Sequence, residues 1–433
     1  MLRKTIVLLL AAAAPVAADG YSGDKLAFLI PGLYGPSGLI VDSDAPLPNG
    51  QTHSAHFNGS FTLSFSQLNV AQASQLASVP IASPASGFTY AFDPGSGVFT
   101  RSTNSFGPIV ADRAETIGRG KFMVGFSYQR FSFDTIEGMD LDSLPAVFTH
   151  DDYQLGGGRA DIVTTVNNIN LTQDQFTTVF GYGLLDRFDV SLAVPVVRTD
   201  LAVTSTATIQ RVGTGQEREI HYFRDASGNL GDTRVYTDSG EATGIGDMIL
   251  RIKGTALRRG SFGLALAADF RFPTGDEENL LGSGAMGIKP YGAVSWSHGR
   301  LSPHLNVGYE WNGDSVLAGD ILSGTKGDFP DQFLYTVGAD VGVNKRLTLA
   351  FDFLGNRVID SPRAVPTTFT ADNGQTFSDL LFEKGSFNQS SASVGIKANA
   401  GARLLVDFNI LFRLDDNGLR DRATPLVGVE YNF

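Results

Sequence analysis

The sequence predicts an all-β protein, a transmembrane antiparallel up-and-down β-barrel of about 12 strands with an N-terminal plug or periplasmic cap. Three observations predict this fold class. Segments of roughly 9 to 13 residues alternate apolar and polar side chains, which is the length of a tilted strand that crosses a bilayer. The connections between these segments alternate between short and long, and the chain begins with an export signal.

The export signal occupies residues 1–18. Arg3 and Lys4 precede an apolar run, and small residues up to Ala18 suit cleavage after that position. The run is shorter than the roughly 20 residues that a spanning helix needs. We therefore expect the mature chain to begin at Asp19. Loss of the two cations takes the formal net charge from −12 to −14. This charge argues against nucleic acid as a partner.

Residues 19–120 do not alternate as the rest of the chain does. A short amphipathic helix is expected over 63–79 and a hairpin over 87–103. The segment is too apolar for a plain disordered tail. We predict a plug inside the barrel or a periplasmic cap. An extra strand pair, or an extension packed on the barrel without a gating role, remain the alternatives.

Residues 121–433 are predicted to form the barrel. Short turns alternate with long polar connections, which is typical of periplasmic turns and extracellular loops and gives an even number of strands. The twelve expected strands are 121–133, 161–182, 188–200, 244–257, 262–273, 288–297, 301–312, 332–343, 347–358, 387–400, 404–414 and 424–433. The expected long loops are 134–160, 201–243, 274–287, 313–331, 359–386 and the shorter 415–423.

The last strand has an apolar face that ends on an aromatic residue. Val427, Val429, Tyr431 and Phe433 share one side of an extended chain. This ending resembles the C-terminal signal by which bacterial outer-membrane barrels are recognised by their assembly machinery. We therefore expect the barrel-assembly machinery to be a partner through Phe433.

The second face of the strands carries charged and polar side chains of both signs. A Lys or Arg on the lipid face would cost about 2–4 kcal/mol at mid-bilayer, so these residues are predicted to line the lumen. Many are expected to pair across neighbouring strands. The candidates are Asp247, Arg251, Lys253, Asp269, Arg271, His304, Glu310, Asp340, Asp352, Lys397, Asp407, Arg413 and Glu430.

Three stretches in the order 244–247, 272–284 and 303–311 resemble a known family. They read Gly-Ile-Gly-Asp, Phe-Pro-Thr-Gly-Asp leading to Leu-Leu-Gly-Ser-Gly, and a run that contains Gly-Tyr-Glu. The family is the outer-membrane channel family named for the meta-pathway of phenol degradation, which is similar to the long-chain fatty-acid transporters. The resemblance covers residues 181–433 and implies a channel for hydrophobic compounds. The same motifs also fit simple structural corners at the rim.

Two functions are consistent with these patterns. The first is a channel in the bacterial outer membrane for passive passage of small solutes, hydrophobic or aromatic ones among them. The second is a closed structural or adhesive barrel that acts through its long loops. Lipid and lipopolysaccharide are the expected surroundings. The chain has no Cys, its six His residues are scattered, and no nucleophile motif accompanies them, so we predict no catalytic residue, cofactor or metal site.

Overall fold

The structure is a computed structural model. It describes residues 25–34, 39–40, 56–58, 66–78, 90–93, 98–101, 105–150, 161–213, 221–225, 227–401 and 403–433. The expected signal peptide, residues 1–18, lies outside these ranges. In the part of the chain that is described, no helix is both long and apolar enough to cross a bilayer.

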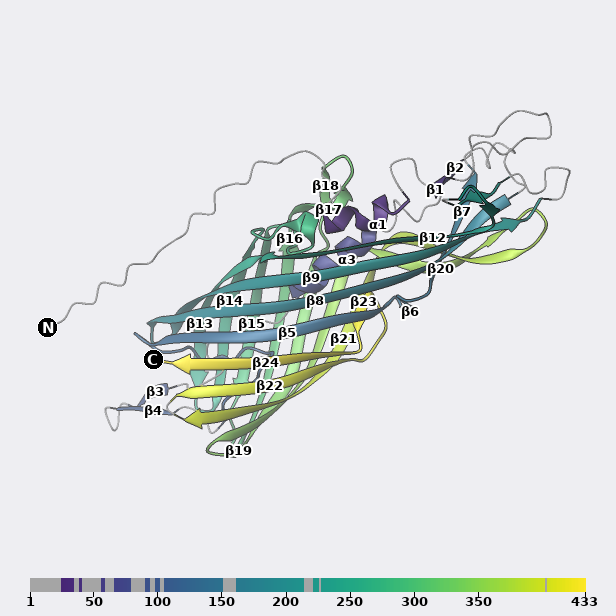
Figure 1. Cartoon of the computed structure of the whole chain (residues 1–433). Coiled ribbons are helices and arrows are strands. Elements are labelled where there is room, and N and C mark those ends of the chain that lie inside the picture. The colour runs from purple at the N-terminus through teal and green to yellow at the C-terminus, as the bar shows by residue number, and fades with distance from the viewer. Residues whose placement is uncertain are drawn as a thin grey trace.

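Twelve antiparallel strands close into a barrel, as the alternation predicts (Figure 1). Each pairs with the next along the chain, and the last pairs with the first, with Val429 opposite Phe126. The strands are β5 (Phe122–Ile136), β8 (Asp161–Leu185), β9 (Phe188–Arg211), β13 (Met248–Arg259), β14 (Phe262–Phe272), β15 (Gly287–Trp296), β16 (Leu301–Asn312), β19 (Gln332–Asn344), β20 (Leu347–Thr370), β21 (Thr376–Gly401), β22 (Leu404–Arg413) and β24 (Ala423–Asn432).

Shorter strands and helices lie beside the barrel strands or connect them. The strands are β1 (Leu39–Ile40), β2 (His56–Asn58), β3 (Tyr90–Asp93), β4 (Val98–Arg101), β6 (Met139–Asp140), β7 (Leu144–His150), β10 (Phe223–Arg224), β11 (Leu230–Gly231), β12 (Thr233–Ile245), β17 (Asp314–Asp320), β18 (Thr325–Asp328) and β23 (Leu419–Asp421). The helices are η1 (Leu26–Phe28), α1 (Leu29–Gly32), α3 (Ser66–Ser78) and η3 (Glu277–Asn279). The expected N-terminal helix and hairpin are present as α3 and β3–β4.

Two of the expected long loops are instead continuations of the wall. β9 runs to Arg211 and pairs there with β12, and β20 and β21 pair as far as Thr370 and Thr376. The physical reason is that the alternation of inward and outward side chains continues beyond the membrane-crossing part of the strand. Leu201, Val203 and Ala207 remain buried on one face of β9. The strands therefore run past their expected ends at residues 200, 358 and 387, and those expected ends are wrong.

The outer surface of the barrel is apolar. Large side chains on it are more than half exposed in the isolated chain, among them Phe126 at 58%, Leu266 at 60% and Trp311 at 54%. Such a belt on a closed barrel is stable only when lipid covers it. The protein is therefore a bacterial outer-membrane barrel, with its short turns at the periplasmic end. Figure 1 shows β3 and β4 beyond the end that holds the C-terminus, whereas α1 and α3 lie further toward the long hairpins.

The lipid-facing assignment of Leu266 gives the first testable prediction. Leu266→Arg should lower the free energy of unfolding by about 2–4 kcal/mol, because the residue lies near the middle of a membrane-crossing strand. Urea unfolding of the barrel in lipid vesicles, followed by tryptophan fluorescence, measures this change. Leu266→Phe is the control and should unfold like the unmodified protein. Equal stability of the Arg and Phe variants would contradict the assignment.

Candidate functional site

A segment without regular secondary structure crosses the periplasmic half of the lumen. We call residues 105–117 the inner plug. Its backbone N–H groups bond to side chains of separate strands: Phe106 donates to Thr348 Oγ1 at 2.9 Å, Ala114 to Ser295 Oγ at 2.9 Å, and Ile117 to Asp189 Oδ2 at 3.0 Å. These partners belong to β20, β15 and β9, on different sides of the barrel. The wall therefore satisfies the backbone groups that an irregular buried segment leaves unpaired.

Arg113 joins the inner plug to one side of the wall. Its Nη2 lies 2.9 Å from Asp340 Oδ2, and the two side chains are 2% and 0% exposed. Ser105 contacts both groups. His304 lies behind this pair, with Nδ1 3.5 Å from Asp340 and Nε2 2.5 Å from Asp352. A guanidinium on the plug thus meets an acidic cluster on the wall, in a place where an unpaired charge is costly.

The preceding residue, Asp112, joins the plug to another side of the wall. Its carboxylate accepts from Lys253 Nζ at 2.9 Å and from the Tyr291 hydroxyl at 2.7 Å, and Arg251 Nη1 is 3.6 Å away. The neighbouring residues Asp112 and Arg113 therefore pair with opposite charges on β13 and on β19, and Asp112 also accepts from a neutral hydroxyl on β15. Polar contacts thus fix the orientation of the plug, and Ile109 and Ile117 also pack in small buried apolar clusters with wall side chains.

A second element fills the extracellular half of the lumen. We call residues 25–34 and 66–78 together the outer plug. Side-chain amides of α3 donate to backbone carbonyls: Asn69 to Ala27 at 3.0 Å, Gln72 to Leu280 at 3.1 Å, and Gln75 to Leu419 at 3.0 Å. The last two carbonyls belong to segments between barrel strands, so the outer plug is bound to inward-folded connections.

Lys25 adds an ionic contact at the rim of the outer plug. Its Nζ lies 3.1 Å from both Asp276 and Glu278. Partial burial opposes the charge of Lys25, but hydrogen bonds to these two carboxylates outweigh it and raise its pKa. Partial burial likewise opposes ionisation of Asp276, yet hydrogen bonds from Asn279 and Lys25 hold its pKa below the ordinary value. Both groups therefore stay charged at neutral pH, although the exposed position limits the stabilisation.

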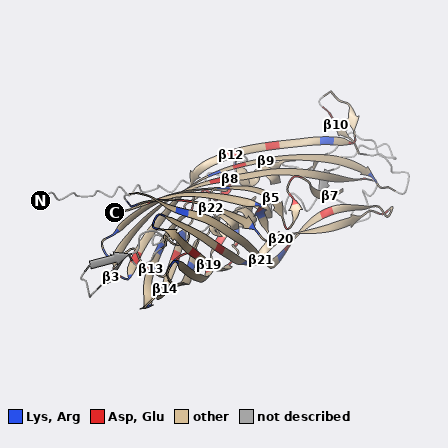
Figure 2. Cartoon of the chain, turned by 90° about the horizontal axis from the view of Figure 1, so that it is seen from below, with Lys and Arg blue, Asp and Glu red and all other residues tan. Residues whose placement is uncertain are grey.

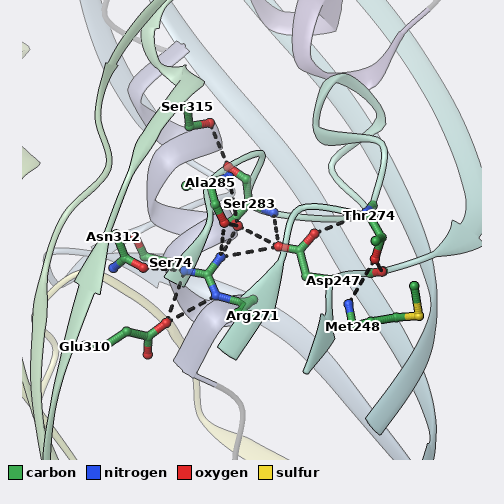
Figure 3. Close-up of polar contacts among 12 residues, drawn as sticks. Ser74, Asp247, Met248, Arg271, Thr274, Ser283, Ala285, Glu310, Asn312 and Ser315 are labelled. Carbon is green, nitrogen blue, oxygen red and sulfur yellow. Dashed lines mark hydrogen bonds and ion pairs between the residues drawn. The ribbon is translucent and has the colours of Figure 1, made fainter. Parts of the chain in front are cut away.

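Arg271 organises the connection that supports the outer plug (Figure 3). Its guanidinium lies 3.3 Å from Asp247 and 3.1 Å from Glu310, and it contacts Ser283. Asp247 in turn accepts the Ser283 N–H at 2.8 Å. A Cβ at Gly282 would collide with Asp247. The glycine-rich stretches singled out in the sequence thus meet at one polar cluster, which folds the 273–286 connection into the lumen.

A cavity of about 180 Å³ lies between the two plugs. We call it the chamber. Gln75 and Ser78 of the outer plug line one side of it, and Val110 to Asp112 of the inner plug line another. The remaining lining comes from the wall. The two plugs thus bound a space inside the barrel.

The sequence-predicted lumen residues lie on strands of the wall, apart from Asp247, which directly precedes β13. All are buried except Arg413, whose side chain is 17% exposed and bonds to Asp134. Figure 2 shows residues of both signs distributed along the strands. The buried set is Asp247, Arg251, Lys253, Asp269, Arg271, His304, Glu310, Asp340, Asp352, Lys397, Asp407 and Glu430.

Sequence reasoning missed the residues of the plug that meet this set. Arg251 pairs with Asp269 at 2.7 Å along the wall, as expected, but Lys253 and Asp340 pair with the plug, and Lys397 donates to the Pro108 carbonyl at 3.2 Å. The available signal was the adjacent charged pair Asp112–Arg113, which interrupts the uncharged run 105–111.

Removal of the Arg113 guanidinium should loosen the inner plug. Arg113→Ala leaves Asp340 buried without its cation, which costs about 3–5 kcal/mol for such a pair. We expect faster hydrogen exchange of the amides of residues 105–117, while the amides of mid-barrel strands stay protected. Arg119→Ala is the matched control, because Arg119 is exposed. Unchanged protection of the plug in Arg113→Ala would contradict the assigned role of this pair.

Comparison with known proteins gives a family match. The model of the family described as "Putative MetA-pathway of phenol degradation" matches residues 146–417, more than half of the chain. The matched range begins after both plugs. No curated protein sequence matches the chain at a significant level.

Solved structures with a similar fold include three barrels. An outer membrane channel from Pseudomonas putida F1 has a TM-score of 0.45 and 14% identity over 74% of this chain and 98% of that one. The P. putida toluene transporter TodX has a TM-score of 0.31 and 9% identity, over 72% and 90%. A Pseudomonas aeruginosa FadL homologue has a TM-score of 0.28 and 10% identity, over 73% and 89%.

Proposed function

Since the chain belongs to the family described as "Putative MetA-pathway of phenol degradation", we propose that it is an outer-membrane channel for small solutes. Passage is passive, with no covalent chemistry and no energy coupling within the chain. The observation that carries the proposal is the pair of plugs, each bound to the wall by polar side-chain contacts, with a chamber between them. A path opens when the plugs leave their polar partners.

The solute class proposed is small, hydrophobic or aromatic molecules. The chamber supports this choice, because Phe131, Phe133 and Leu354 form part of its lining, and small-molecule sites are lined mainly by apolar and aromatic side chains. A ring buried against them removes apolar surface from water, which favours residence in the chamber. The polar residues of the lumen then provide the hydrated route on either side.

Two further partners are proposed for the outside of the barrel. Lipid and lipopolysaccharide cover the apolar belt. The barrel-assembly machinery recognises the C-terminal strand through Phe433, which is 55% exposed and lies beside Phe122 and Tyr431 with ring centroids 5.5 and 4.8 Å away. These rings form an outward-facing aromatic cluster where the first and last strands meet. The assembly machinery can bind this cluster before the barrel closes.

Conductance in a planar bilayer tests the channel proposal. The mature protein is compared with a variant in which Gly-Ser segments of equal length replace residues 66–78 of the outer plug and 105–113 of the inner plug. The wild type should show only brief openings, and the variant should show a large steady current, because it lacks the contacts of Gln72 and Gln75 and those of Asp112 and Arg113.

Two outcomes would contradict the proposal. Equal steady currents in both proteins would indicate an open porin in which the plugs do not gate. Silence from both, with the barrel shown to be folded, would favour the closed structural or adhesive barrel. The observation that favours this alternative is the extension of β8, β9, β20 and β21, each 24–26 residues long, well beyond the length that crosses a bilayer.

A further inference from the structure

The chamber between the plugs has the size of a binding site for one small ring. Its volume is about 180 Å³. A protein cavity of about 150 Å³ holds benzene, so the chamber accommodates a benzene ring with a small substituent. The chamber is bounded by the outer plug and the inner plug, and a molecule within it is held between the two closures.

One wall of the chamber is aromatic. Phe131 and Phe133 are consecutive inward residues of β5, with ring centroids 5.8 Å apart and planes at 8°. They are 8% and 7% exposed, and Leu411 on β22 lines the same cavity. A flat apolar group that enters the chamber therefore meets ring surfaces of the kind that bind other rings.

Arg420 supplies a cation beside this aromatic wall. The residue is on β23, where Asp421 pairs with Phe133 and Arg420 with Thr135, and a bulge separates Arg420 from Asp421. A bulge re-aims the side chains of its strand. Here Arg420 and Asp421 both line the chamber, and Arg420 is 7% exposed.

Arg420 has no described carboxylate at ion-pair distance, and Asp415, Asp416 and Asp421 attract its charge only from further away. Its Nη2 donates to the Ser390 carbonyl at 2.6 Å and to Ser391 Oγ at 3.0 Å, but Nε has no acceptor, and it forms no ion pair with any carboxylate that the structure describes. Each of the other three cationic side chains that line the chamber has a carboxylate partner. Arg413 bonds to Asp134 at 3.0 Å, and Lys289 and Arg251 lie 3.1 and 2.7 Å from Asp269.

A second donor without an acceptor lines the same cavity. Gln129 is 4% exposed, precedes Phe131 on the inner face of β5, and leaves its Nε2 unbonded. Buried donors are normally satisfied, and an unpaired buried cation is more costly than an unpaired amide. Arg420 and Gln129 thus each place a buried N–H group that lacks an acceptor among the residues that line the chamber.

We propose that the chamber binds a small aromatic carboxylate, with its ring on Phe131 and Phe133 and its carboxylate on Arg420. The proposal deepens the channel function and rests on it for its biological setting. A carboxylate is the group that a guanidinium binds best. An anion that carries an aromatic ring can place its carboxylate on Arg420 and its ring on the aromatic wall at the same time. A neutral aromatic compound contacts only the apolar wall and leaves the charge of Arg420 without a bound anion.

Binding to the purified full-length protein tests this proposal. Calorimetric titration compares benzoate with benzyl alcohol, which has the same ring and a neutral hydroxyl. Benzoate should bind more tightly by about tenfold or more, because it makes a charge-assisted bond. Arg420→Gln should remove this advantage and leave the affinity for benzyl alcohol within about threefold, as the apolar wall is intact.

Arg422→Gln is the matched control. Arg422 is two residues away and its side chain is 82% exposed, so its loss should leave benzoate affinity unchanged. Equal binding of benzoate and benzyl alcohol to the wild type would overturn the proposal without any variant, even if Arg420→Gln does not fold. Retention of the benzoate preference in folded Arg420→Gln would also overturn it.

The result of the binding experiment can be distinguished from the result of the conductance experiment. If benzoate binds through Arg420 but the plug-replacement variant carries no current, the binding site stands and the channel function fails. If current appears on plug replacement but benzoate shows no preference over benzyl alcohol, the channel function stands and the carboxylate site fails.

Discussion

The width of the barrel is the constraint on which the rest of the structure depends. A barrel of about eight strands is just filled by its own inward side chains, so twelve strands leave an interior that wall side chains do not close. The inward face is therefore polar, and the chain fills the space with separate segments. Both segments bind the wall or its connections, the outer plug through Gln72 to the 273–286 connection and the inner plug through Phe106 to β20 in the periplasmic half.

Polar contacts fix the position of both plugs, and the outer plug is also packed in a large buried apolar cluster that includes Phe28 and Leu68. The buried Arg113–Asp340 and Lys253–Asp112 pairs fix one arrangement, since each charge is costly without its partner. Charged groups also have a good alternative partner in water. When water enters the lumen, a segment held by ion pairs can leave the wall because water then solvates its charges. A segment held by a large apolar surface cannot, because leaving would expose that surface to water.

The sequence was sufficient to predict the barrel, because alternation is local and each strand carries it independently. It was sufficient to place Arg251 and Asp269 on the inner face for the same reason. It did not give the partner of Asp340, since Arg113 lies far away in the chain and only the closed barrel brings them together. The length of β9 and β20 was missed because Thr, Ser and Asp in the outer hairpins resemble loop composition, although inward Val and Leu continue.

The central claim is that the inner plug must leave the wall for a solute to pass. The chain has no Cys, so Ala114→Cys with Gly263→Cys creates a unique pair. A Cβ on Gly263 would lie 2.9 Å from that of Ala114, close enough for a disulfide after a shift of about 1 Å. Single-channel recording of the oxidised protein should show no openings, and addition of reductant should restore those of the wild type. Openings of equal frequency before and after reduction would contradict the account.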